Sequence, residues 1–561
     1  MYSRFFLQTV SPPAVFAAAD TASAADSIGY YRTGPRKKRV EIRVRLLPFF
    51  RIFAGTFQLF REMMKKGFSF SRFCHIIIDG LSPERFVFTG SGDIFRKGME
   101  NVTVTDSILE QVHRIHFVGI GGSGMSPLAE ILHAEGYQIT GSDCGESDNR
   151  KRIEALGIPV YTGHRAENLG DTELVVYTAA VSRDNPELAA ADARGIPVLE
   201  RAKLLGILSR HYEQTVAVSG THGKTTTTSM IAQILLEAGT DPSLFIGGRL
   251  PLIGANGRAG HSPYLICEAC EFQDHYLEMT PAVAVVLNVD ADHLDYFGTL
   301  DNVIRSFAKF SAKATRAVIY NAEDANTCRA VEAAAAPKIS FGTTEEADWS
   351  ARQLTVFDGA YYAYDLYHDG SLFAHIRLGV PGRHNVLNSA AAAAAAFLCG
   401  ATAEQIAVGL AHFRGAGRRF EFLGTFRGVT VADDYAHHPT EIAATLQAAK
   451  AMPYRRVWAV FQPFTYSRTA QHLQEFADTL SLADTAVVSD IMGSREQNDW
   501  NVSSTQIVER MTNGIYLPDF ESIASFVAEQ AAEGDLVITM GGGDVYKCAR
   551  MIAAKLEQIP Q

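Results

Sequence analysis

The sequence lacks a cysteine framework. Its 561 residues include seven cysteines, an odd number without the spacing of a disulfide scaffold. This excludes a disulfide-rich secreted domain and predicts a reducing compartment, so we expect a cytoplasmic protein. Cys267 and Cys270 form the only closely spaced pair, and without a second pair or a downstream histidine pair they make at most half a zinc site.

A hydrophobic run long enough to span a bilayer is also missing. The apolar stretch at residues 46–60 contains Arg51 and is too short, because a transmembrane helix needs about 20 apolar residues. A signal peptide is not expected, since no short basic start leads into a clean apolar run and a cleavage site. We expect no stable membrane insertion, although the basic run at residues 36–39 leaves a surface anchor open.

Positive charge is scarce in most of the chain. Residues 1–98 hold 16 Lys and Arg against 7 Asp and Glu, a net charge of +9, so the rest carries −20 of the total of −11. An acidic body offers no basic stripe to neutralise phosphates, so nucleic-acid binding is not expected. Residues 1–98 are predicted to be a poorly ordered basic extension or a mis-assigned start, with Met99 as the natural beginning.

Strand and helix patterns alternate after residue 99, which predicts an α/β fold with three domains. A chain of this length exceeds what one hydrophobic core organises. We place the domains at residues 99–210, 211–416 and 417–561, with glycines at 415–417 as a hinge. The first and third are predicted to be Rossmann-like. The predicted strands include 114–118, 174–177, 215–219, 264–267, 283–287, 457–461, 486–489 and 536–540.

The second domain shows two further patterns. Alternating aromatic and β-branched residues at 354–378, with Asp-Gly turns at 358–359 and 369–370, predict antiparallel hairpins inserted in a parallel sheet. The alanine run at 390–396 follows Asn388 and Ser389, which are good N-cap residues, so it predicts a packed helix rather than a linker.

A glycine-rich loop lies between the strand predicted at 215–219 and a helix predicted at 225–238. Backbone N–H groups of such a loop bind phosphate, Lys224 can reach the terminal phosphates, and the Thr225 hydroxyl can ligate Mg²⁺. The pattern departs from the full phosphate-loop motif because residue 218 is Val. The loop consists of Gly220, Thr221, His222, Gly223, Lys224 and Thr225.

A second glycine-rich turn follows the first strand. It comprises Gly119, Gly121, Gly122, Gly124 and Met125, and Asp143 stands 19 residues after Gly124. This spacing is typical of a dinucleotide fingerprint with the acidic residue on a ribose hydroxyl. The pattern by itself indicates only that a diphosphate can approach the backbone, and UDP carries one as well as NAD does.

Acidic residues follow two predicted strands. Glu268 and Glu271 come after residues 264–267, and Asp290, Asp292, His293 and Asp295 come after a strand predicted to end at residue 289. Carboxyl ends of parallel strands face the ligand crevice in this fold class. Oxygen ligands such as Thr225 and Glu268 suit Mg²⁺, whereas a nitrogen from His293 would also suit Mn²⁺. A third polar segment, residues 433–441, predicts a helix start at Thr440 and Glu441, with His437 and His438 facing substrate.

Together these motifs resemble the Mur ligase family, from about residue 114 onward. The likeness covers the turn at 119–125, the loop GTHGKTTT at 220–227, the acidic segment at 268–271 and the NVDADH segment at 288–293. It continues through GRHNVLN at 382–388, the RRFE junction at 418–421 and the segment at 433–441. The family implies a UDP-binding domain, a central ATPase domain and a C-terminal amino-acid-binding domain.

The resemblance also implies chemistry. A carboxylate of UDP-N-acetylmuramate attacks the γ-phosphate of ATP, and the amine of L-alanine displaces phosphate from the acyl phosphate. It implies ATP contacts from the loop, including Thr226, and from His384, Asn385 and Asn388. It further implies UDP-sugar binding by the first turn, metal ligation by Thr225, Glu268 and His293, and γ-phosphate stabilisation by Lys224. Arg419 is expected to steady the transferring phosphate, Arg468 and His438 to bind the amino acid, and His437 or His438 to be candidate bases.

One departure affects the amino acid. The family's QPHxYxR stretch reads QPFTYSR here, so Arg468 is kept and Phe464 replaces a histidine. A sister ligase for another amino acid or peptide therefore remains an alternative. A nicotinamide dehydrogenase would leave the phosphate loop without a role, and an ATP-gated binding protein would use Lys224 without amide chemistry. Oligomeric state is not indicated.

Overall fold

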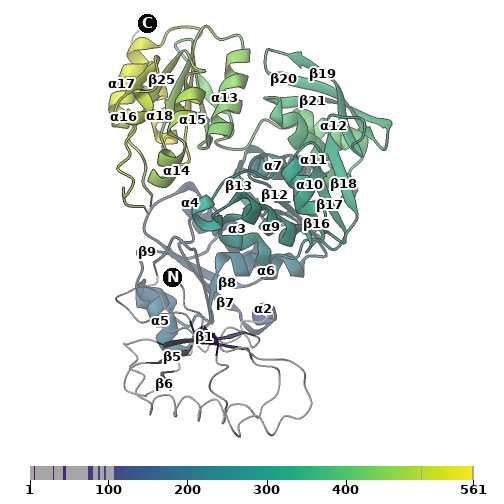
Figure 1. Ribbon diagram of the computed structural model, residues 1–561, viewed down its shortest axis with the longest axis vertical. Helices are drawn as coiled ribbons and strands as arrows, with labels where there is room; N and C mark the ends of the chain where they lie inside the picture. Colours follow the sequence, from purple (N-terminus) through teal and green to yellow (C-terminus); the bar gives the residue numbers. More distant parts are fainter. Residues whose placement is uncertain are drawn as a thin grey trace. The chain divides into compact units, whose positions relative to one another are not determined.

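The computed structural model describes residues 106–182, 184–494 and 496–558, together with six short strands before residue 100 (Figure 1). The chain divides into two compact units, Met1–Val104 and Thr105–Gln561. The prediction for residues 1–98 otherwise lies outside the described residues. The early strands form a pair and a four-stranded sheet: β1 Phe5–Phe6, β2 Gly29–Tyr30, β3 Ile42–Arg45, β4 Cys74–Asp79, β5 Phe86–Phe88 and β6 Ile94–Phe95.

The first sheet of the larger unit is wholly parallel, with strand order β11-β10-β7-β8-β9. This is the Rossmann-like arrangement predicted from strand and helix alternation. Its strands are β7 Arg114–Val118, β8 Gln138–Asp143, β9 Val160–Thr162, β10 Leu174–Tyr177 and β11 Val198–Glu200. Its helices are α2 Ile108–Gln111, α3 Ser126–Ala134, α4 Asp148–Ala155, η1 Ala166–Leu169, α5 Pro186–Arg194 and α6 Arg201–His211.

A buried carboxylate holds part of this first sheet together. Glu187 is fully buried at the start of α5 and accepts hydrogen bonds from Ser142 at 2.6 Å and Asn168 at 2.6 Å. His164 lies 3.0 Å and His116 3.6 Å from the same carboxylate. Burial alone would raise the pKa of Glu187, but these partners lower it to about 2. The ionised carboxylate is therefore the form that stabilises the fold.

We expect Glu187→Gln to lower the free energy of unfolding at neutral pH by about 3 kcal/mol, the equivalent of the pKa difference. Because the folded pKa lies below the usual 4.5, this contribution is present above pH 4.5 and is lost as the pH falls towards 2. Urea unfolding of both proteins between pH 7 and pH 2 should therefore give stabilities that converge at the acid end. Exposed Glu167→Gln is the matched control, and parallel curves would contradict the assignment.

The second sheet has ten strands in the order β14-β13-β15-β12-β16-β17-β18-β19-β20-β21. The strands in the middle of the sheet run parallel to their neighbours. At one end β14 is antiparallel to β13, and at the other end β19, β20 and β21 pair in antiparallel order. The strands are β12 Gln214–Ser219, β13 Ser243–Leu250, β14 Ala255–Arg258, β15 Tyr264–Glu268, β16 Val283–Val286, β17 Ala317–Asn321, β18 Lys338–Gly342, β19 Trp349–Phe357, β20 Tyr361–His368 and β21 Ser371–Pro381. The helices are α7 Lys224–Glu237, η2 Pro251–Ile253, η3 Phe272–Glu278, α8 Leu294–Phe297, α9 Leu300–Ser311, α10 Ala325–Val331, α11 His384–Leu398 and α12 Ala403–His412.

The predicted hairpins exist with both predicted turns, and because β19 pairs in parallel with β18 they continue the main sheet. Two other predictions about this domain need correction. The helix with the alanine run begins at His384, so Asn388 and Ser389 lie inside α11 instead of capping it. The strand predicted to end at residue 289 ends at Val286. The small alanine side chains of α11 are buried and let it pack closely against α7.

The third sheet has the order β22-β23-β27-β24-β25-β26, with only β22 antiparallel to its neighbour. Its strands are β22 Glu421–Phe426, β23 Val429–Asp434, β24 Val457–Phe461, β25 Thr485–Val488, β26 Gly514–Tyr516 and β27 Leu536–Met540. Its helices are α13 Pro439–Ala451, α14 Tyr466–Gln471, α15 Leu473–Leu480, α16 Thr505–Val508, α17 Phe520–Gln530 and α18 Tyr546–Gln558. The predicted domain boundaries themselves stay predictions. Among the described residues, every helix is too short or too polar to cross a bilayer.

Candidate active site

The phosphate loop joins β12 to α7 in the middle of the central sheet. Gly223 caps the helix with a φ of 85°, a left-handed conformation that favours glycine. A Cβ at this position would also lie 2.6 Å from Oδ1 of Asn388. The loop can therefore lie this close to Asn388 only because residue 223 has no side chain.

Lys224 is held at the loop by three acceptors. Its ammonium group donates to the carbonyl oxygens of Gly220 at 2.5 Å and Thr221 at 3.1 Å, and it lies 2.9 Å from the Glu271 carboxylate. Burial would lower the pKa of Lys224, but the negative charge of Glu271 raises it above its usual value. The side chain therefore stays cationic in a nearly water-free position.

Thr225 and Glu268, two of the three predicted metal ligands, are brought together. The Thr225 hydroxyl donates to Oε2 of Glu268 at 2.8 Å, and the same oxygen accepts from the N–H of Gly247 at 2.9 Å. They meet because β15 pairs directly with β12. A hydroxyl and a carboxylate oxygen at this separation fit the ligand preference of Mg²⁺.

His293, the third predicted ligand, lies after β16 in a left-handed conformation with φ 53°. Its ring packs on Phe272 with 5.0 Å between ring centroids, and its Nε2 lies 3.8 Å from the Asp292 carboxylate. Among the hydrogen bonds and ion pairs of the described residues, none joins His293 to Thr225 or Glu268. Burial lowers its pKa, so a neutral ring with a free lone pair is favoured. Its metal role stays a prediction.

Asn288 braces the loop from the next strand. Its side chain accepts from the N–H of His222 at 2.7 Å and donates to the His222 carbonyl at 3.0 Å, while its own carbonyl accepts from Thr221. The sequence prediction gave Asn288 no role, although it stands in the segment that resembles the family. The position of this amide, two residues beyond a buried strand, was the feature of the sequence that could have predicted its role.

The predicted ATP-binding residues on α11 also lie near the loop. Asn388 approaches Gly223, donates to Asn385 at 3.0 Å, and Asn385 donates to the Pro381 carbonyl at 2.6 Å. His384 is exposed, and its ring lies next to Gly382. Their contacts with nucleotide remain predictions.

In the first domain, Asp143 braces the glycine-rich turn. Its carboxylate accepts from the N–H of Gly121 at 2.9 Å and of Gly145 at 3.1 Å. A Cβ on Gly121 would lie 2.9 Å from the Ser147 hydroxyl, so that close approach requires glycine. The carboxylate thus holds the turn itself, and its contact with a ribose stays a prediction.

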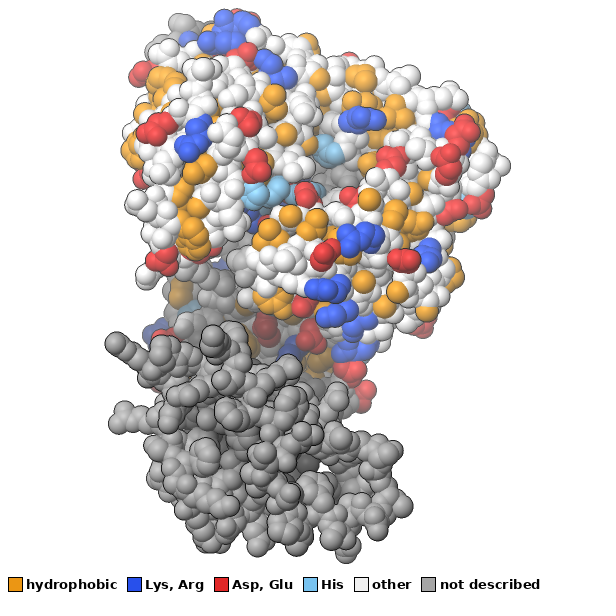
Figure 2. Space-filling model, in the orientation of Figure 1, with side chains coloured by type: hydrophobic (Ala, Val, Ile, Leu, Met, Phe, Trp, Pro, Cys, Tyr) orange, Lys and Arg blue, Asp and Glu red, His pale blue; other side chains and the backbone are white. Residues whose placement is uncertain are grey.

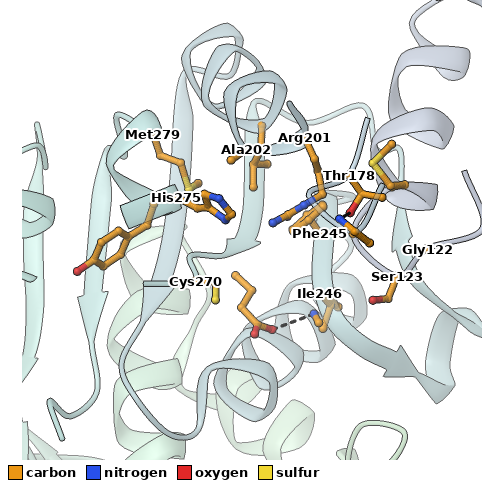
Figure 3. A pocket seen from close by; sticks show the side chains of 17 residues that line it. Gly122, Ser123, Thr178, Arg201, Ala202, Phe245, Ile246, Cys270, His275 and Met279 are labelled. Carbon is orange, nitrogen blue, oxygen red and sulfur yellow. Dashed lines mark hydrogen bonds between the residues drawn. The ribbon is translucent and has the colours of Figure 1, made fainter. Parts of the chain in front are cut away.

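A cavity of about 360 Å³ lies between this turn and Glu268, one of the metal-ligand candidates (Figure 3). The turn contributes Gly122, Gly124 and Met125, and the central domain contributes Glu268 and Cys270. Arg201 also lines it, with its Cδ 2.9 Å from where a Cβ of Gly124 would lie. The sequence prediction missed Arg201, which stands at the start of an ordinary-looking helix. One cavity therefore offers an arginine near one end and a carboxylate near the other.

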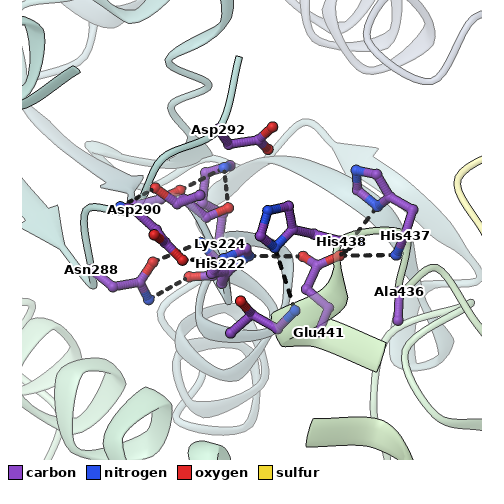
Figure 4. Close-up of polar contacts among 12 residues, drawn as sticks. His222, Lys224, Asn288, Asp290, Asp292, Ala436, His437, His438 and Glu441 are labelled. Atoms are coloured by element: carbon purple, nitrogen blue, oxygen red, sulfur yellow. Dashed lines mark hydrogen bonds and ion pairs between the residues drawn. The ribbon is translucent and has the colours of Figure 1, made fainter. Parts of the chain in front are cut away.

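Residues of the third domain meet the phosphate loop (Figure 4). Glu441 accepts from His222 at 3.1 Å and lies 3.2 Å from Nδ1 of His437. His438 caps α13 in a capping box with Glu441, as the predicted helix start at Thr440 and Glu441 requires. On the visible face of the space-filling view, histidine side chains gather beside a hollow (Figure 2). Glu441 thus connects the loop with two histidines.

The two arginines of the RRFE junction have different surroundings. Arg418 is bound to Asp433 at 2.9 Å and to the carbonyl oxygens of Gly541 and Gly543. Arg419 stacks on Tyr435 with its guanidinium 5.1 Å from the ring centroid. Arg418 therefore has a structural position, whereas the Arg419 guanidinium makes no hydrogen bond within the part of the chain that the structure describes.

The comparisons with known proteins agree across the chain. Residues 114–213 match the Mur ligase family catalytic domain, residues 218–396 the Mur ligase middle domain, and residues 418–543 the Mur ligase glutamate ligase domain. The chain belongs to the Mur ligase family. The resemblance predicted from the motifs is thereby confirmed.

Several relatives are similar to this Mur ligase over most of their length. A UDP-N-acetylmuramate–L-alanine ligase of Agathobacter rectalis is 46% identical over 448 residues, covering 79% of this chain and 98% of the relative. The enzyme of the same name from Caldanaerobacter subterraneus is 43% identical, covering 78% and 97%. The crystal structure of the UDP-N-acetylmuramate–alanine ligase of Thermotoga maritima is 29% identical with a TM-score of 0.68, covering 79% and 98%. The three-domain α/β fold is therefore confirmed.

A further cluster in this Mur ligase has the composition of a metal site. Ligand atoms of His222, Asp290 and His438 lie within 4.8 Å of one another. Burial would lower the pKa of His222, but the carboxylates of Asp290, 3.6 Å away, and Glu441, 3.1 Å away, raise it to about 9. An imidazolium has no lone pair for a cation, so the cluster is better described as an ion pair that connects the loop with α13.

Proposed function

We propose that the chain is an ATP-dependent ligase that joins L-alanine to the carboxylate of UDP-N-acetylmuramate through an acyl phosphate, in peptidoglycan synthesis. The observation that supports this most is the single cavity running from the glycine-rich turn to Glu268, next to the Lys224 loop. The backbone of the turn can bind the diphosphate of the UDP-sugar, and the carboxylate of the same substrate can then reach the phosphoryl-transfer site. We place this activity in the cytoplasm.

In this proposal the loop backbone and Lys224 hold the phosphates of ATP. The buried ammonium offsets the repulsion between the triphosphate and the approaching carboxylate, which otherwise opposes their encounter. Mg²⁺ held by Thr225 and Glu268, and by His293, would supply further positive charge at the β- and γ-phosphates. Arg419, whose guanidinium is not bound by backbone carbonyls, steadies the transferring group.

The two candidate bases differ in their tautomers. The Tyr435 carbonyl can only accept, so Nδ1 of His437, 3.0 Å away, carries a proton and Nε2 keeps a lone pair. The Thr440 N–H can only donate, so Nδ1 of His438 accepts and its neutral ring carries the proton on Nε2. Burial lowers the pKa of His438 to about 4, which keeps it neutral. His437 is therefore the better acceptor for a proton of the alanine ammonium.

Phosphate release from ATP and Mg²⁺ with UDP-N-acetylmuramate tests the proposal, comparing L-alanine, L-serine and glycine with no amino acid. We expect release that requires both substrates and is fastest with L-alanine. Fastest release with another amino acid would make the chain a sister ligase and assign the difference to Phe464. Release without any amino acid would favour an ATP-gated protein, and no release would reject the ligase.

A further inference from the structure

Arg468 and Asp292 form an ion pair between α14 and the segment after β16. Nη2 of Arg468 donates to Oδ1 of Asp292 at 3.0 Å, and each side chain is 13% exposed. The two residues are 176 positions apart in the sequence. Among the described residues, Asp292 is the one acceptor that the Arg468 side chain contacts. A single N–H of five is therefore used in a site with little water.

We propose that this ion pair is the receptor for the amino-acid zwitterion, with Arg468 taking the α-carboxylate and Asp292 the α-ammonium. The inference rests on the proposed ligase function and adds Asp292 as the group that recognises the amine. An α-amino acid carries its two charges on neighbouring atoms of one carbon. Inserted between the two side chains, it replaces one ion pair by two and leaves no charge unpaired.

Burial makes this exchange selective. Separating a largely buried ion pair leaves uncompensated charges unless the ligand supplies both partners. A carboxylate without an ammonium group pairs with Arg468 but leaves Asp292 alone, and the site rejects it for that reason. The guanidinium suits a carboxylate because it can donate two parallel hydrogen bonds. The pair thus selects zwitterions over simple acids.

The surroundings of the pair fit an amine that must lose a proton. Figure 4 shows Asp292, His437 and His438 around the same space. Phe464 stands edge-on to His437 with 6.4 Å between ring centroids, so an apolar side chain lies beside the candidate base. A small apolar amino acid is compatible with these neighbours.

The test combines two variants with two ligands. Propionate is L-alanine without its ammonium group, and it is used as a competitive inhibitor. In Asp292→Asn we expect KM for L-alanine to rise roughly tenfold or more, because the ammonium loses its charged partner. Ki for propionate should fall, because Arg468 no longer has an internal competitor. Arg468→Gln should weaken both ligands, and KM for ATP and UDP-N-acetylmuramate should stay unchanged in Asp292→Asn.

A higher KM for L-alanine together with a lower Ki for propionate would show that Asp292 recognises the ammonium group, because a structural role would not change the two constants in opposite directions. Equal weakening of both, or no change in either, would overturn the proposal. A raised Mg²⁺ requirement in Asp292→Asn would assign the residue to the metal site next to His293 and would also overturn it. Asp301→Asn, which removes an exposed carboxylate paired with Arg329 on α10, is the matched control. A wild-type chain without alanine-dependent phosphate release would instead reject the proposed function, so the two failures are distinguishable.

Discussion

Lys224→Met should lower turnover roughly a thousandfold, the effect of removing a buried cation from a phosphoryl-transfer site. Lys224 is kept protonated by Glu271 and lies at the loop where the terminal phosphates of ATP would bind. Methionine fills the space of the side chain without its charge. Single-turnover phosphate release at saturating substrates measures the loss directly, and near-normal release would reject the role.

The single variant needs a second substitution as a control for stability. Removing Lys224 leaves the Glu271 carboxylate buried without its cation, which costs about 3–5 kcal/mol of stability. We expect Lys224→Met with Glu271→Gln to recover the unfolding temperature and to remain inactive. Recovery of turnover together with stability would show that the first variant failed by unfolding. Lys309→Met, on the exposed side of α9, is the matched control.

Glu268→Gln should lower turnover roughly a hundredfold, equivalent to about 3 kcal/mol of lost transition-state stabilisation. The amide keeps the shape of the side chain but offers no negative oxygen at the position next to Thr225 and Gly247. The Mg²⁺ concentration needed for half-maximal activity should rise with it.

Binding of Mn²⁺, followed by electron paramagnetic resonance with a non-hydrolysable ATP analogue, gives a readout independent of turnover. Weaker binding in Glu268→Gln is expected, whereas unchanged affinity would remove Glu268 from the metal site. Glu278→Gln is the matched control because its side chain is exposed at the end of η3. Restoration of activity by high Mg²⁺ would place the defect in metal binding rather than in folding.

Local sequence determined much of the architecture. Short apolar runs separated by glycine-containing turns were enough to predict some strands of each of the three sheets, because strand formation in buried parallel sheets follows hydrophobic patterning. The turns at Asp358-Gly359 and Asp369-Gly370 were predicted because Asp-Gly favours the hairpin conformation. The loop between β12 and α7 and the family resemblance followed from residues that are neighbours in the chain.

The start of α11 was predicted wrongly. Asn388 and Ser389 have the chemistry of helix caps, but the helix starts at His384, where Asn385 donates to the Pro381 carbonyl after the turn at Gly382. The hairpins were predicted, whereas their place in the sheet depends on a nonlocal contact, the parallel pairing of β19 with β18. Local propensity favours several conformations of a segment, and the energy of strand pairing determines which of them forms.

The sequence alone thus determined the fold class, the phosphate loop and the family, since each depends on local spacing. Only the tertiary structure decided which side chains meet. Strand order placed Glu268 and Asn288 on either side of the loop. Folding of the third domain against the loop brought Glu441 to His222 and Arg468 to Asp292, across 219 and 176 residues of chain. Such contacts have no signature in local sequence, because they arise from how whole domains pack.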